Sequence, residues 1–275
     1  MRLALLLFLA ICMVACDEDT SGVVKSTRPT LDVPFSTIPV TQRDVRELVM
    51  ATNANGIKAE IIGIAENALL LLDIDATRVE PVLLGQPNKG VSAQNAMLEN
   101  NFIAVIGSGF VSELHTLEPV GLLQVNGKTL SPVQGHGYTR ILGINDAGMG
   151  VVHRESYQRE LFYSALQAGP GIVEQGKLDI SERDLQRPKY FRSFIAICDN
   201  RWLAGVSLAP THLRTLGQTL LQHIEKQGLQ CGDVVNLAGD RQAVLMFQAD
   251  DKTVVYHGNP TTYKVSLVGF RLKAT

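Results

Sequence analysis

A tight corner between two apolar runs contains the residues best suited to acid–base chemistry. The runs are Val234–Leu237 and Ala243–Phe247, and they read as two short strands around a turn. Between them lie Asp240 and Arg241. A carboxylate can activate water, and a guanidinium can bind a phosphate or a carboxylate. The same two residues are equally typical of a solvated pair in a bend, so the corner is either an active-site loop or a simple turn.

A second corner, Gly107-Ser108-Gly109, follows the apolar run Phe102–Ile106. It begins like a dinucleotide-binding fingerprint, but Ser112 stands at the third glycine position and Pro119 arrives before a helix of useful length. A bound pyrophosphate would therefore lack a helix N-terminus. We expect no nucleotide here, and the alternative is a turn in which small residues permit close approach of the backbone.

The histidines and serines give no support for a metal centre or a hydrolase nucleophile. No histidine has a histidine at i+4 or a cysteine at a metal-ligand spacing. The six are His115, His136, His153, His212, His223 and His257. Gly-x-Ser-x-Gly is also absent from the sequence. We therefore expect no metal ion and no cofactor.

The composition is that of an ordinary folded protein. The 275 residues are 45% apolar and 19% charged, and 25 Lys plus Arg against 27 Asp plus Glu give a net charge of -2. A chain of this length can form one large domain or two small ones. The charge balance provides no general attraction to nucleic acid, and no long basic run provides a local one. Nucleic acid is therefore not an expected partner.

The N-terminus resembles the secretion signal of a bacterial lipoprotein. Met1-Arg2 precedes the apolar run Leu3–Ile11, which is too short to span a membrane. The run leads to Ala15-Cys16, and acidic residues follow at once. We predict a signal peptide over residues 1–15 and, over residues 16–33, a lipidated Cys16 with a polar tether.

This signal predicts that the folded part, residues 34–275, lies on the periplasmic side of a bacterial cell envelope and is anchored to the membrane by lipid. Asp17 favours the inner membrane, by similarity to enterobacterial lipoproteins. The alternative is a plain signal peptide and a soluble periplasmic protein. Cys198 and Cys231 would meet an oxidising compartment, where they either pair or remain two buried thiols.

Alternating apolar patterns predict a strand-rich fold. Segments 58–64, 68–74 and 79–84 follow one another with polar separators, which indicates antiparallel strands. Hairpins are expected at Asn126-Gly127 and at Asn145–Gly148.

Three helices are expected among these strands. They cover 41–50, 92–100 behind Ser92, and a leucine-rich segment between a Thr211 cap and Gly228. The apolar stripe of the last helix is Leu213, Leu216, Leu220, Leu221 and Ile224. Because no repeat is present, we predict one α+β domain with a mostly antiparallel or mixed sheet and a few packed helices.

Four segments, taken in order, resemble the phosphodiester glycosidase family, the domain of the enzyme that removes N-acetylglucosamine to uncover mannose 6-phosphate. They are Ala104–Val111, Leu166–Lys177, Arg192–Ala196, and a stretch from Leu216-Gly217 to Leu237-Ala238-Gly239. The resemblance covers roughly residues 58–272, and Gln167–Pro170 is its most specific piece. It implies an envelope glycan or a sugar phosphate as the ligand.

The resemblance also implies which residues bind that ligand. Arg192 matches the family's arginine and suits a phosphate or carboxylate; the alternative is a surface charge. Gln167 and Gly169 would line a sugar cleft; the alternative is a structural turn. The remaining candidates are Gly107, Ser108, Gly109, Asn236 and Gly239.

Two departures from the family pattern bear on catalysis. Members usually carry Asn-Gly-Gly-Phe-Phe in place of Gly107–Val111, and Leu-Asp-Gly-Gly followed by a serine in place of Leu237–Gln242. The resemblance therefore places Ala238 where the catalytic carboxylate belongs, a loss that typically costs roughly a hundredfold to ten-thousandfold in rate. We expect activity that is impaired, altered or rescued by Asp240. The alternative is a lipoprotein that binds a glycan or another protein without catalysis.

Overall fold

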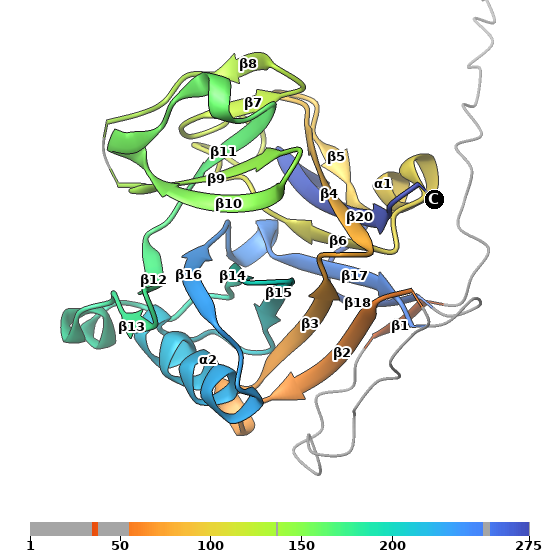
Figure 1. Ribbon diagram of the computed structural model, residues 1–275. Coiled ribbons are helices and arrows are strands. Elements are labelled where there is room, and N and C mark those ends of the chain that lie inside the picture. Colours follow the sequence, from red (N-terminus) through yellow and green to blue (C-terminus); the bar gives the residue numbers. More distant parts are fainter. Residues whose placement is uncertain (1–34, 38–54, 136, 250–253, 275) are drawn as a thin grey trace, which may run out of the picture. The chain divides into compact units, whose positions relative to one another are not determined.

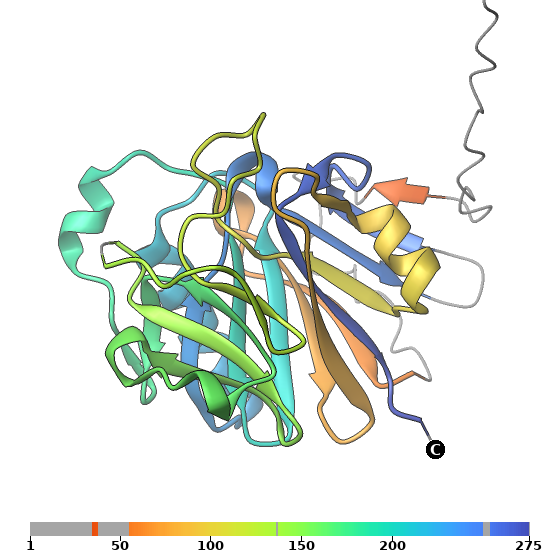
Figure 2. The same cartoon turned by 90° about the horizontal axis from the view of Figure 1, so that it is seen from above.

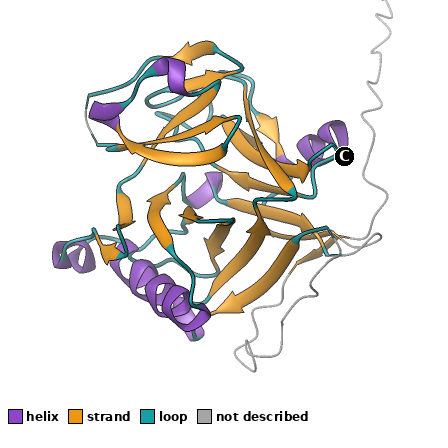
Figure 3. Cartoon of the chain, viewed as in Figure 1, coloured by secondary structure: helices purple, strands orange, loops and turns teal. Residues whose placement is uncertain are grey.

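The computed structural model describes residues 35–37, 55–135, 137–249 and 254–274, which belong to the unit Leu31–Thr275 (Figure 1). The predicted signal peptide, Cys16, the tether and the helix expected over 41–50 lie outside the described residues. Strands dominate the described part and helices are few, as the α+β prediction requires (Figure 3).

The largest sheet has seven antiparallel strands in the order β13-β12-β16-β14-β15-β3-β2. Its strands are β2 Ile57–Ile62, β3 Leu69–Asp75, β12 Gly171–Glu174, β13 Lys177–Leu178, β14 Ser193–Cys198, β15 Arg201–Ser207 and β16 Cys231–Asn236. The continuous apolar run in β3 reflects burial on both faces: Leu70 and Leu72 face the central core, while Leu69 and Leu71 face a helix.

The second sheet has six strands in the order β1-β18-β17-β6-β20-β4. Its strands are β1 Phe35–Thr37, β4 Val79–Gly85, β6 Ala104–Gly107, β17 Val244–Gln248, β18 Val254–Gly258 and β20 Ser266–Leu272. The pair β1–β18 is parallel and the other pairs are antiparallel. This sheet therefore confirms the predicted mixed pairing.

Two smaller sheets complete the fold. One contains β7 Leu123–Val125, β8 Lys128–Ser131, β9 Arg140–Asn145, β10 Gly148–His153 and β11 Ser164–Ala168, and the other pairs β5 Val91–Ser92 with β19 Tyr263–Lys264. Both predicted hairpins are confirmed, and Asn126 and Gly127 have the positive φ angles, 48° and 76°, that a tight turn requires. Side chains of the three larger sheets meet in one hydrophobic cluster, for example Leu72, Leu142 and Val268.

The two α-helices lie on outer faces of the sheets (Figures 1 and 2). Helix α1, Ala93–Asn100, begins as predicted: Ser92 Oγ accepts a hydrogen bond from Asn95 N at 3.2 Å. It packs beside β6, and α2, Leu213–Gln227, covers the seven-stranded sheet. Five short 3₁₀ turns are also present among the described residues: Ala65–Asn67, Arg154–Ser156, Arg159–Leu161, Glu182–Gln186 and Asp240–Gln242.

Helix α2 confirms its predicted end but not its predicted cap. Gly228 ends it with a left-handed φ of 65°. The Thr211 cap is wrong, because His212 occupies the N-cap position and makes no side-chain capping bond. Asp184, distant in sequence, accepts a hydrogen bond from Arg214 N at 2.9 Å instead. A carboxylate near these free N–H groups serves the same purpose as a local cap.

The two remaining cysteines form a disulfide. Cys198 ends β14 and Cys231 begins β16, and the pair Cys198–Cys231 is bonded. Of the two alternatives that the sequence left open, the structure therefore shows the paired one. Within the described residues, no helix is both long enough and apolar enough to cross a membrane.

Candidate functional site

The corner between β16 and β17 joins two sheets and is not a hairpin turn. β16 pairs with β12 and β14, whereas β17 pairs with β6 and β18. The structure confirms the two predicted strands around a turn, and it shows that they belong to different sheets. The corner, residues 238–242, carries the chain from the seven-stranded sheet to the six-stranded sheet, with a 3₁₀ turn at Asp240–Gln242.

The two glycine corners meet through their backbones. Ala238 N donates a hydrogen bond to Ser108 O at 3.1 Å. A Cβ on Gly107 would lie 2.1 Å from Gln242 O, and one on Gly239 would lie 2.3 Å from Phe191 O. Because no larger residue fits at either position, the small residues are required for close approach. The structure thus brings Gly107, Ser108 and Gly239 together.

Arg192 lies directly beside this junction. Its neighbour Ser193 accepts a hydrogen bond from Leu237 N at 2.8 Å, and a Cβ on Gly239 would be 3.9 Å from Arg192 Cα. The Arg192 side chain is half-buried, with Nε donating to Thr211 O at 3.4 Å and its guanidinium carbon 5.0 Å from the Tyr190 ring centre.

Burial lowers the pKa of the Arg192 guanidinium, and the negative charges of Asp184 and Asp240 oppose that shift. No carboxylate among the described residues lies within 4.0 Å of the guanidinium nitrogens. A half-buried guanidinium without a close acidic partner is suited to bind an anionic ligand.

Asp240 turns back onto Phe191, the residue that precedes Arg192. Its backbone N donates to Phe191 O at 3.0 Å, and its Oδ1 accepts from Phe191 N at 3.2 Å. Its φ is 49°, in the left-handed region that residues other than glycine seldom adopt and that often marks functional sites. The side chain is exposed, so the second carboxylate oxygen remains accessible to a ligand.

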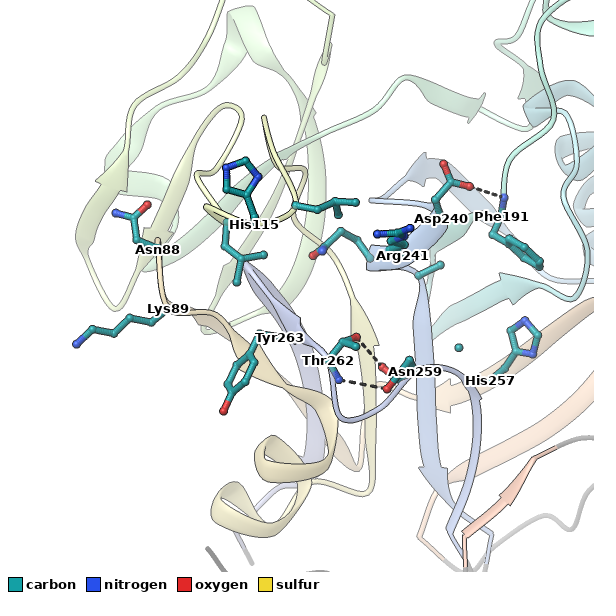
Figure 4. A pocket seen from close by; sticks show the side chains of 15 residues that line it. Asn88, Lys89, His115, Phe191, Asp240, Arg241, His257, Asn259, Thr262 and Tyr263 are labelled. Atoms are coloured by element: carbon teal, nitrogen blue, oxygen red, sulfur yellow. Dashed lines mark hydrogen bonds between the residues drawn. The ribbon is translucent and has the colours of Figure 1, made fainter. Parts of the chain in front are cut away.

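A cavity of about 910 Å³ opens beside Asp240 (Figure 4). Its lining comes from five separate stretches of the chain: Asn88, Lys89, Leu114, His115, Leu117, Phe191, Asp240, Arg241, Gln242, Ala243, His257, Gly258, Asn259, Thr262 and Tyr263. Figure 4 shows Asp240, Phe191 and His257 on one side and Asn88, Lys89, His115 and Tyr263 on the other. Sites for small molecules commonly have volumes of roughly 300–1,000 Å³.

Two buried polar side chains, those of Lys264 and Gln242, contact or belong to the lining of this cavity. Lys264 is 1% exposed, and its Nζ donates to Arg241 O and to Thr262 Oγ1. Burial lowers the pKa of Lys264 to about 8. Gln242 is buried, and its Oε1 has no hydrogen-bond partner. Lys264 therefore ties the corner to the turn at Asn259–Thr262 and brings a positive charge close to the cavity.

His257 forms part of the wall near Phe191. The two ring centres are 6.2 Å apart. Burial lowers the pKa of the imidazole, and a hydrogen bond with the Ser207 backbone opposes that shift. The ring is therefore largely uncharged near neutral pH and adds an aromatic surface to the wall.

Of the predicted site residues only Asp240 lines the cavity, and the predicted ligand-binding residues, Arg192 included, lie outside its lining. Gln167 is buried and uses its whole amide group: Oε1 accepts from Leu122 N and Gln134 N, and Nε2 donates to Gln134 O and Tyr138 O. These bonds hold two loops in place, which is the structural alternative that the sequence left open. No oxygen or nitrogen of the amide is left for a sugar.

Gly169 and Asn236 hold each other. Asn236 Nδ2 donates to Gly169 O at 3.0 Å, and Gly169 N donates to Asn236 O at 2.8 Å. Asn236 Oδ1 is buried without a partner. In the corner Gly107–Gly109, Ser108 Oγ lies 3.0 Å from Ser266 Oγ, and a Cβ on Gly109 would lie 2.4 Å from Ser266 Oγ. These residues shape the junction behind the cavity rather than its surface.

The sequence gives little signal for several cavity residues. Phe191 could have been suspected from its position next to Arg192, and Tyr263 from the turn signal Asn259-Pro260 that precedes it. Nothing in the sequence indicates that Lys264 is buried. Among the described residues, no cluster of three or more histidine, cysteine or acidic side chains is placed to hold a metal ion.

The family model for phosphodiester glycosidases matches residues 100–264, which is more than half of the chain and includes both glycine corners. No curated protein gives a significant match. Among solved structures, the catalytic domain of zebrafish N-acetylglucosamine-1-phosphodiester α-N-acetylglucosaminidase, auto-inhibited by its pro-peptide, aligns with a TM-score of 0.58 at 12% identity. The alignment covers 82% of this chain and 86% of that one.

Two further structures share the fold. A hypothetical protein from Synechocystis aligns with a TM-score of 0.52 at 11% identity over 79% of this chain and 62% of its own. A protein from Burkholderia pseudomallei that is described as exported gives the same TM-score and identity over 78% of this chain and 74% of its own.

Proposed function

Since this chain belongs to the phosphodiester glycosidase family, we propose that it binds a sugar phosphate in the cavity beside Asp240 and that any cleavage depends on this carboxylate. Ala238 holds the position at which the resemblance places the usual catalytic aspartate. Its methyl side chain cannot activate water or stabilise a sugar cation. The ordinary activity of the family is therefore impaired, and Asp240 is the carboxylate nearest along the chain.

One observation carries this proposal. Asp240 lines the cavity, and its carboxylate accepts a hydrogen bond from the backbone N of Phe191, the residue directly before Arg192. Arg192 carries a half-buried positive charge beside the corner. A carboxylate and a guanidinium placed together in this way suit a sugar cation and its phosphate.

The proposed reaction is hydrolysis of the bond between the sugar C1 and the phosphate oxygen. The departing phosphate takes the bonding electron pair, and the sugar passes through an oxocarbenium-like state. Asp240 accepts a proton from water as the water oxygen bonds to C1. The products are the free sugar and a phosphomonoester, and Arg192 and Arg241 offset the negative charge of the phosphate.

A second candidate is a binding protein without catalysis. The observation that favours it is the hydrogen bond from Phe191 N, which occupies Asp240 Oδ1 and holds the carboxylate against the protein's own backbone. In that case the cavity binds a glycan, or the protein presents this face to another protein of the envelope.

Hydrolysis of an α-linked sugar-1-phosphodiester separates the two candidates. The protein, expressed from residue 17, is assayed for released sugar beside Asp240→Asn and beside the control Asp146→Asn, an exposed aspartate in the β9–β10 hairpin. A rate of sugar release that falls at least about tenfold in Asp240→Asn, but not in Asp146→Asn, supports catalysis by Asp240. Measurable sugar-phosphate affinity without turnover in any form supports the binding protein and rejects catalysis.

We further propose that the protein is held at the periplasmic face of a bacterial envelope through lipid on Cys16. The apolar N-terminal run followed by Ala15-Cys16 supports this location, as does the fold shared with a protein described as exported. Fractionation of cells that express the wild type and Cys16→Ala tests it. The wild type should be in the membrane fraction and the variant should not, and equal distribution would contradict lipid anchoring.

A further inference from the structure

The cavity beside Asp240 has apolar walls that a sugar phosphate does not need. Leu114 and Tyr263 line it while 45% and 43% exposed, and Leu117, Phe191 and Ala243 extend the apolar surface inward. Large apolar side chains left in contact with water in a concave site commonly mark a place that a ligand covers. The volume of about 910 Å³ leaves room for a group beyond the sugar and its phosphate.

A short loop positions part of this apolar wall. Ser112 N donates to Glu118 O at 3.0 Å, and Val120 N donates to Phe110 O at 2.9 Å. These bonds close the loop directly after the corner Gly107–Gly109. Leu117 N bonds back to Glu113 O at 3.1 Å. Leu114 is therefore presented to the cavity by a loop whose two ends are held by backbone hydrogen bonds.

The polar side chains of the cavity favour an anion. Lys89 and Arg241 line it, with one carboxylate, that of Asp240, among the described lining residues. Lys264 adds a positive charge behind Arg241, and no carboxylate of a described residue forms an ion pair with it. Gln242 also lines the cavity, and its Oε1 is buried without a hydrogen-bond partner.

Apolar walls combined with cationic side chains match one class of ligand. We propose that the cavity binds an alkyl phosphate group, so that the preferred ligand is a sugar phosphodiester whose second ester oxygen carries a hydrocarbon chain. The chain lies along Leu114, Phe191 and Tyr263, and the phosphate lies near Arg241. The sugar part of this ligand rests on the proposed function, whereas the phosphate and the hydrocarbon chain do not.

Simple alkyl phosphates test the inference without any sugar. The probe is a series from butyl phosphate to decyl phosphate below micelle-forming concentrations. Their affinity is measured by calorimetry on the full-length protein carrying Cys16→Ser. Complete burial strengthens binding by about fourfold for each methylene, so half-burial of six methylenes predicts about 60-fold tighter binding of decyl phosphate. Decyltrimethylammonium, with the same chain and the opposite charge, should bind at least tenfold more weakly than decyl phosphate.

A matched pair of leucine variants tests where the hydrocarbon chain of the ligand lies. Leu114→Asn should weaken decyl phosphate binding about threefold to tenfold and leave butyl phosphate binding unchanged. The control is Leu185→Asn, a leucine of similar exposure, 49%, outside the cavity lining. Arg241→Ala should weaken both phosphates by a similar factor. Affinity independent of chain length, or equal losses in the two leucine variants, would overturn the inference.

The results separate this inference from the proposed function. A protein that binds decyl phosphate through Leu114 but neither binds nor cleaves a sugar phosphodiester contradicts the proposed function alone. A protein that cleaves a sugar phosphodiester and binds all alkyl phosphates with equal affinity contradicts the alkyl site alone.

Discussion

Lys264 gives a prediction that can be worked out from the structure. The amine is buried against two residues that line the cavity, Arg241 and Thr262, and its pKa is lowered from 10.5 to about 8. Between these two values the unfolded chain binds more protons than the folded protein, so stability rises as the pH increases. At about 1.4 kcal/mol for each pH unit, the complete effect from pH 7 to 9.5 is about 2 kcal/mol. Water in the adjacent cavity screens the charge, so the expected gain is about 1 to 2 kcal/mol.

The assay is urea unfolding of the wild type and Lys264→Met at pH 7 and pH 9.5. Methionine keeps the length of the side chain, and the loss of the bonds to Arg241 O and Thr262 Oγ1 lowers stability equally at both pH values. The free energy of unfolding of the wild type minus that of Lys264→Met should therefore increase by about 1 to 2 kcal/mol from pH 7 to pH 9.5. Lys89→Met, which replaces an exposed lysine lining the same cavity, serves as the reference.

An unchanged difference between pH 7 and 9.5 would refute the reasoning, because it would mean that Lys264 binds its proton equally well in the folded and unfolded states. A decrease in this difference from pH 7 to pH 9.5 would contradict a lowered pKa of Lys264. Other groups that titrate in this range contribute equally to both proteins and cancel in the comparison.

Three further predictions concern the scaffold around the site. Replacing both Cys198 and Cys231 by serine should lower the free energy of unfolding by about 2 to 4 kcal/mol, because the bond closes a long loop; urea unfolding that shows no loss would contradict a formed disulfide. Leu220→Ala, at a fully buried position of α2, should cost about 2 to 5 kcal/mol in the same assay, and a cost below 1 kcal/mol would place the helix elsewhere. Gly239→Ala brings a Cβ within 2.3 Å of Phe191 O, so it should cost about 1 to 3 kcal/mol and reduce sugar-phosphate affinity measured by calorimetry; a variant equal to the wild type would contradict the close contact.

Local patterns account for the parts of the fold that the sequence predicts well. The leucine spacing of α2 and the turn at Asn126-Gly127 are properties of short windows, and both are confirmed. The cap of α2 is supplied by Asp184, a residue nearly thirty positions before the helix, so the window around Thr211 contains no sign of it. Propensity near a helix end predicts a cap only when no distant side chain replaces it.

Pairing between distant strands explains what the sequence could not predict at the corner. β17 pairs with β6, more than a hundred residues earlier, and this pairing places the two glycine corners against each other. The family resemblance brings together Arg192, Gly107 and Gly239, as the structure does. The cavity was not predicted, because its walls come from five stretches of chain and each contributes only a few residues. The burial of Lys264 has the same origin, since an isolated lysine in a strand gives no indication of its surroundings.

Restoring the missing carboxylate tests the central claim most directly. Ala238 is buried, and the next residue, Gly239, lies against the backbone of Phe191 and Arg192. Hydrolysis of an α-linked sugar-1-phosphodiester is measured for the wild type and Ala238→Asp, with circular dichroism to verify the fold. We expect a gain of at least about tenfold in the rate of sugar release. A folded Ala238→Asp variant with the same rate as the wild type, or a lower one, would contradict the claim that this corner is a catalytic site lacking its carboxylate.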